Sequence, residues 1–85
     1  MTRRTETNTM GPKLKAYPQS GGFEIVGNRE GLRELARVCL ELAELPEDVE
    51  ESRCLGNHYH FDENLAQGLV EEGSTPFVVL YRPDL

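Results

Sequence analysis

The stretch Asn28–Leu45 constrains the fold most, because its apolar residues return at intervals of three and four. That spacing places them on one stripe of a helix with 3.6 residues per turn. Asn28 is a favourable N-cap, and Pro46 ends the helix because the residue before a proline avoids helical geometry. We therefore expect one amphipathic helix with a buried stripe. The stripe residues are Leu32, Leu35, Ala36, Cys39, Leu42 and Ala43.

Two features of this helix follow from the same pattern. Val38 and Leu40 fall outside the stripe and widen the apolar surface. Cys39 falls inside it and is expected to be an ordinary buried thiol. A disulfide between Cys39 and Cys54 is not expected, because the chain shows no export signal.

Three short segments have the pattern of β-strands. Phe23–Val26 lies between glycine turns, Asn57–Asp62 alternates aromatic with polar residues, and Pro76–Arg82 is apolar on both faces. A strand that is apolar on both faces is typically central in its sheet. Lys13–Tyr17 is compatible with a fourth strand paired with Phe23–Val26, and this alternative stays open.

The order of these elements, (β)-β-α-β-β, predicts the α+β class, with one amphipathic helix packed on a small sheet of three or four strands. Residues 21–85 would form this single domain. Residues 1–20 hold few large apolar side chains and four basic residues, so we expect a disordered basic segment there. A body this small has little surface to bury, and self-association often supplies the missing burial.

The charge of the predicted body is strongly negative, because residues 21–85 contain fourteen acids and five arginines. This balance disfavours nucleic acid and anionic membranes as partners, since their phosphates would be repelled, and it favours a basic protein. Acids that only keep the protein soluble are the plain alternative. With no apolar run near the roughly 20 residues of a membrane span and no signal peptide, we expect a cytoplasmic protein.

The acids are densest in the last turns of the predicted helix and just after it, where the segment from Glu41 to Glu51 holds six carboxylates. We expect an acidic loop there that faces a basic partner. The predicted contact residues in it are Glu47, Asp48, Glu50 and Glu51.

His58, His60 and Asp62 alternate along one predicted strand and would therefore share one face. Their chemistry suits a transition metal, but neighbours on that face stand about 6.6 Å apart, which is too far for three ligands on a straight strand. We therefore expect no metal and no other cofactor. The face would point to water or to a partner, while Tyr59 and Phe61 pack toward the helix. Buried, hydrogen-bonded histidines are the remaining alternative.

No sequence motif for catalysis accompanies these residues. Cys54, Ser52 and Ser74 lack the surroundings of an activated nucleophile, and the glycines form no phosphate-binding loop. We therefore expect a protein that is not an enzyme and works by binding.

Three runs of sequence resemble a known family: FEIVGNREGLRELARVCLELAEL, NHYHFDENL and LVEEGSTPFVVLYR. Together they cover Phe23 to Arg82 and are similar to the Immunity protein 32 family of bacterial polymorphic toxin systems, whose members are small α+β proteins. The resemblance implies neutralisation of a cognate toxin by direct binding, without catalysis or a cofactor. The basic N-terminal extension is not part of the pattern.

Three hypotheses follow. The first is an immunity protein whose partner is a toxin, and the second is a small homodimeric domain with a regulatory or ligand-binding role. The third is a metal-dependent enzyme that uses His58, His60 and Asp62. A toxin gene beside this one would favour the first over the second, and retained metal in the purified protein would favour the third.

Overall fold

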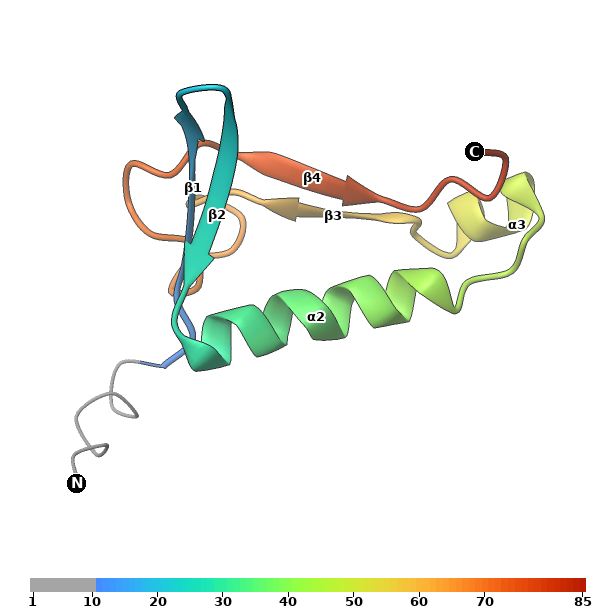
Figure 1. Cartoon of the computed structure of the whole chain (residues 1–85). Helices are drawn as coiled ribbons and strands as arrows, with labels where there is room; N and C mark the ends of the chain where they lie inside the picture. Colours follow the sequence, from blue (N-terminus) through green and yellow to red (C-terminus); the bar gives the residue numbers. More distant parts are fainter. Residues whose placement is uncertain (1–10) are drawn as a thin grey trace.

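The computed structural model describes residues 11–85, in which two β-hairpins and two helices are arranged around a small core (Figure 1). The α+β class is confirmed, with one main helix and four strands, and the strands form two separate two-stranded sheets. The elements in chain order are β1 Leu14–Gln19, β2 Gly22–Gly27, α2 Arg29–Ala43, α3 Val49–Cys54, β3 His58–Phe61 and β4 Phe77–Leu80.

The first hairpin confirms the strand that the sequence left open over Lys13–Tyr17. β1 pairs antiparallel with β2, and the two strands are joined through Gly21, whose φ of 78° favours glycine. The expectation of a disordered segment over residues 1–20 therefore does not hold for residues 14–19. Residues 1–10, which belong to the same expectation, lie outside the described part of the chain.

β1 also has a second neighbour, the segment 69–75. The Leu14 N–H donates to the Leu69 carbonyl at 2.7 Å, and the Glu71 N–H donates to the Leu14 carbonyl at 2.8 Å. Further along, the Thr75 N–H donates to the Ala16 carbonyl at 2.7 Å. β1 is therefore hydrogen-bonded along both edges, which explains why a segment of modest sequence signal is held in the fold.

The second hairpin has one buried face and one exposed face. Tyr59 lies opposite Val79 and Phe61 opposite Phe77, and the Phe61 and Phe77 rings stack at 4.8 Å. As predicted, Tyr59 and Phe61 pack toward the helix and Phe61 is fully buried. The expectation that Pro76–Arg82 forms a central strand is wrong. The second sheet has only two strands, so β4 is an edge strand. The helix covers one face of this sheet, and the other face of β4 remains exposed.

The helix α2 follows the predicted range closely, but its buried side coincides with only one edge of the predicted stripe: Leu42 is buried and Leu35 packs against the core, as expected. Gly31, Val38 and Leu42 are its buried residues, so Val38 belongs to the core and not outside it. Leu32 is 46% exposed and Cys39 is exposed, and both were expected to be buried. At 100° per residue these two lie about a quarter-turn from the buried side. The helix thus carries two apolar stripes, and only one of them reaches the core.

A close approach at the start of α2 fixes which stripe is buried. Gly31 lies against the backbone of Lys13, and a Cβ atom at Gly31 would overlap the Lys13 carbonyl. No other residue type fits so near a neighbouring backbone. Gly31 therefore brings the N-terminal turn of α2 against β1 and turns Val38 and Leu42 toward the core.

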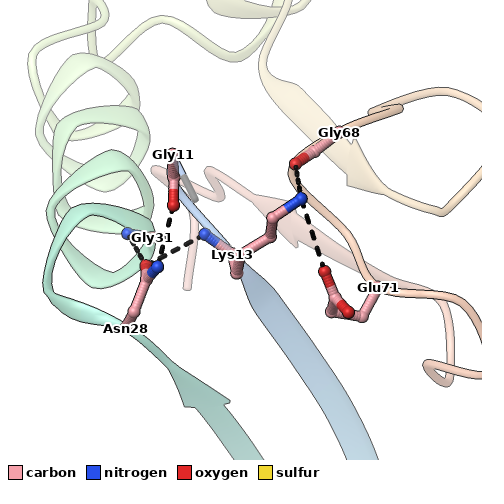
Figure 2. Close-up of polar contacts among 6 residues, drawn as sticks. All are labelled: Gly11, Lys13, Asn28, Gly31, Gly68 and Glu71. Carbon is pink, nitrogen blue, oxygen red and sulfur yellow. Dashed lines mark hydrogen bonds and ion pairs between the residues drawn. The ribbon is translucent and has the colours of Figure 1, made fainter. Parts of the chain in front are cut away.

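Asn28 locks this junction by joining three segments (Figure 2). Its Oδ1 accepts hydrogen bonds from the Gly31 N–H at 2.8 Å and the Lys13 N–H at 3.0 Å, and its Nδ2 donates to the Gly11 carbonyl at 2.8 Å. The N-cap predicted for Asn28 is confirmed, and it also anchors β1. Lys13 extends the junction, because its Nζ donates to the Gly68 carbonyl at 3.1 Å.

The core combines residues from β1, α2, β3 and the segment after β3. In addition to the strands and α2, the turn after β3 contributes three buried apolar side chains, which the sequence alone did not single out. The buried cluster consists of Leu14, Val38, Leu42, Phe61, Ala66, Leu69 and Val70. Within residues 11–85, no helix is long and apolar enough to span a membrane.

Candidate partner-binding site

The acidic segment is partly helical, not the loop that the sequence predicted. Asp48 is the N-cap of α3, and its Oδ1 accepts a hydrogen bond from the Glu51 N–H at 2.9 Å. Glu50 and Glu51 lie in the first turn, where negative charge is favourable next to the helix dipole. Ser52 is the buried residue of α3, and its hydroxyl donates a hydrogen bond to the Val49 carbonyl within the same helix. Two carboxylates therefore lie in the first turn of α3 and a third at its N-cap, all on an ordered support.

The four predicted contact acids, Glu47, Asp48, Glu50 and Glu51, are all exposed. The carboxylates further back on α2 differ, because Arg37 engages two of them. Arg37 forms ion pairs with Glu34 and with Glu41, the latter at 2.7 Å. Hydrogen bonding from Arg37 lowers the pKa of Glu34 below its ordinary value. The unbalanced negative charge of this end of the molecule therefore lies mainly on the α3 side.

His58 and His60 occupy the outer face of β3, as predicted. Both are exposed, and their rings meet edge to face at 5.0 Å. His58 Nδ1 lies 3.2 Å from the Asn57 side-chain oxygen. Across the hairpin, Leu80 lies opposite His58 and Val78 lies opposite His60, and each of these aliphatic side chains is 49% exposed. The outer face of the hairpin is thus a mixed apolar and imidazole surface.

His58 connects this surface to α3. A hollow of about 460 Å³ is lined by Val49 and Arg53 of α3, by His58 and Leu80, and by the chain after β4. Arg82 and Asp84 form a bidentate ion pair at its rim, and the hydrogen bond from Arg82 lowers the pKa of Asp84 to about 2. The acidic helix and the outer face of β3 and β4 therefore border one concave surface.

Three residues that line this hollow were not predicted from the sequence as site residues: Arg53, Arg82 and Asp84. The only local signal was the pairing of opposite charges two residues apart around Pro83. The position of Arg53 became informative only once α3 was known to be a helix, and Asp48 followed by Glu51 three residues later was the capping pattern that could have revealed it.

Asp62 is not brought together with the other predicted contact residues. It lies beyond the end of β3 that is remote from α3, and its Oδ1 accepts a hydrogen bond from the Asn64 N–H at 2.8 Å. Its backbone carbonyl accepts from Leu65 and Ala66, so Asp62 organises the turn that follows β3. Within residues 11–85, no three His, Cys, Asp or Glu side chains gather closely enough to hold a metal ion.

Comparison with known proteins identifies the family. No significant match was found among curated proteins or among solved structures. The model of the family described as Immunity protein 32 matches residues 23–83, which is most of the chain. The matched region contains β2 from Phe23 onward, α2, α3 and both strands of the second hairpin. The chain therefore belongs to the Immunity protein 32 family.

Proposed function

We propose that the protein neutralises a bacterial toxin by binding it directly, through the surface formed by α3 and the outer face of β3 and β4. Membership of the Immunity protein 32 family is the observation that carries this proposal. It supports an immunity role and a protein partner. The nature of the toxin and the contact surface are inferred from the geometry of the described residues.

The charge of the surface favours a basic toxin. Glu47, Asp48, Glu50 and Glu51 are exposed within five consecutive positions, and Arg53 is the only basic residue in α3. Carboxylates this close repel one another, so lysine or arginine side chains of a partner would relieve that repulsion. Complementary charge of this kind mainly accelerates association.

The apolar part of the surface supplies contact area beside the acids. Protein interfaces commonly have an apolar centre and a polar rim. Val78 and Leu80, with His58 and His60 opposite them, provide such a centre, and α3 lies at its edge. His58 lines the hollow that joins the two parts, so a toxin side chain could enter there while the surrounding surface contacts the acids.

Association kinetics test the acidic part of this proposal. The substitutions Glu47→Gln and Glu50→Gln together should slow association with a toxin that copurifies from the native host by roughly threefold or more at low salt. The difference should shrink as salt shortens the Debye length to about 8 Å at physiological ionic strength. Asp48 is left in place because its side chain caps α3. Stopped-flow mixing at two salt concentrations measures both effects.

A matched control separates local charge from total charge. Glu30→Gln and Glu72→Gln also remove one acid from the first turn of a helix and one from a loop, but away from α3. This control should change the association rate little. Equal slowing by both double variants would mean that only the net charge of the protein affects association. No slowing in either variant would mean that the acidic segment is not part of the binding surface.

A further inference from the structure

β2 is an edge strand with one hydrogen-bonded neighbour. β1 lies between β2 and the segment 69–75, whereas β2 pairs with β1 alone (Figure 1). Natural proteins protect such edges with lysine, proline, bulges or covering segments. β2 has the sequence GFEIVG, without proline or lysine, and its pairing with β1 is continuous over six residues. Its other edge is therefore open to strand addition.

The direction of the backbone groups along that edge follows from the bonds of β1. Leu14 and Ala16 direct their backbone groups toward the segment 69–75, away from β2. In an antiparallel pair, residues that lie opposite each other alternate between bonded and non-bonded positions. Ile25, opposite Ala16, and Gly27, opposite Leu14, must therefore direct their N–H and C=O groups to the free edge, as must Phe23.

The side chains along the edge are apolar and half-exposed. Phe23 is 50% exposed and Ile25 is 38% exposed, although Leu14 and Ala16 on the same face of β1 are buried. Leu32 of α2 continues this surface, because its Cδ2 lies beside Gly27. The core thus lies under β1. On the β2 side, Phe23 meets Phe77 of β4 edge to face at 6.4 Å, and Phe23 and Ile25 still keep much of their surface exposed.

We propose that the free edge of β2 pairs with β2 of a second copy of this chain, joining two hairpins into one antiparallel four-stranded sheet about a two-fold axis. The surface is self-complementary, as such a symmetric dimer requires. Phe23, Ile25 and Leu32 become buried between the copies. The proposal goes beyond toxin neutralisation and does not depend on it.

Charge selects the register of this pairing. With Ile25 opposite Ile25 of the other copy, Phe23 lies opposite Gly27 and Glu24 lies opposite Val26. The three residues whose backbone groups point to the free edge, Phe23, Ile25 and Gly27, then form hydrogen-bonded pairs with the other copy. The Phe23 ring of each copy lies over Gly27 of the other. A shift by two residues in one direction would place two Glu24 carboxylates opposite each other, which is unfavourable. A shift by two in the other direction would place Phe23 opposite Arg29, outside β2, and lose that pair. The axis therefore passes through Ile25.

The chain is acidic, but little of its negative charge lies near the free edge of β2, so a second copy can approach there. Glu24 is the only charged residue in β2, and hydrogen bonds from Tyr17 and Gln19 engage it within its own hairpin. The acidic segment follows the C-terminal end of α2, while β2 leads into the N-terminal end. A helix of fifteen residues spans about 22 Å, so the densest negative charge stays away from the pairing edge.

The mass of the protein in solution tests the proposal. Light scattering after gel filtration should give twice the 9.6 kDa of one chain, and the mass should fall toward one chain on dilution to low micromolar concentration.

Ile25→Lys should give 9.6 kDa at every concentration, because two lysines would meet at the axis. Val78→Lys is the control, since Val78 is equally a strand residue with a half-exposed side chain, and it should remain dimeric. A wild-type mass of one chain throughout, or dissociation by Val78→Lys alone, would overturn the proposal.

Cross-linking tests the register without disturbing the fold. In a background with Cys39→Ser and Cys54→Ser, which removes the two exposed thiols, Ile25→Cys should form a covalent dimer on mild oxidation. Directly opposed, hydrogen-bonded residues stand about 5.5 Å apart between Cα atoms, within the range of a disulfide. Glu24→Cys should not cross-link in this register. Efficient cross-linking through Glu24→Cys and not Ile25→Cys would contradict the register that the charge argument selects.

Discussion

Single residues hold the junction of β1 and α2, and Asn28 is the clearest case. Asn28→Ala removes the helix cap and the anchor for Lys13, so we expect a loss of about 2 kcal/mol in unfolding free energy. Asn28→Asp keeps the accepting oxygen but loses the bond from Nδ2 to Gly11, and it should cost less. Urea titration compares the two. Equal losses would mean that the cap itself contributes little.

Gly31 is a second residue whose role depends on space and not on helix propensity. Alanine is favoured over glycine inside a helix by about 1 kcal/mol, so a free helix would gain from Gly31→Ala. Here the new methyl would overlap the Lys13 carbonyl, and we expect a net loss of at least about 2 kcal/mol. Gly22→Ala is the control, because a Cβ there meets no atom within 4 Å. Thermal unfolding of both variants measures the difference, and stabilisation by Gly31→Ala would contradict the close approach.

At the scale of elements, the sequence predicted which segments form strands and the helix but not which side of the helix is buried. Two apolar stripes on α2 satisfy the same periodicity, and the choice between them is made by Gly31 against β1, a contact distant in sequence. The contribution of the turn after β3 was missed for the same reason. Ala66, Leu69 and Val70 have a helical spacing, but the run is too short and is interrupted by Gly68, so it did not stand out. Their burial depends on the pairing of this segment with β1.

The same element gives a direct comparison of its two sides. Leu42 is buried and Leu40 is 64% exposed, two residues away. Leu42→Ala should reduce the unfolding free energy by about 2–5 kcal/mol, as expected for a truncated core leucine. Leu40→Ala should change it by less than about 0.5 kcal/mol. Similar losses in a urea titration would mean that α2 is turned differently about its axis.

At the scale of the whole molecule, the candidate site was only partly visible in the sequence. The exposed acids and the outward position of His58 and His60 followed from composition and from the alternation of β3. Their connection through the hollow at His58 did not, because α3 and the chain after β4 come together only in three dimensions. The fold separates α3 from β2 by the length of α2, whereas β4 begins beside β2, where Phe77 meets Phe23 (Figure 1). The acidic end of the toxin-binding surface and the free edge of β2 would therefore be used separately.

The most direct test of the central claim is a titration of a toxin that copurifies from the native host with the purified protein, with residual toxin activity as the measurement. A protein that neutralises by binding should lower the activity linearly until about one chain per toxin has been added, without dependence on incubation time, provided that the concentrations exceed the dissociation constant. Neutralisation that grows with time at a small fraction of one equivalent would instead indicate catalysis, and unchanged toxin activity at several equivalents would contradict neutralisation of that toxin.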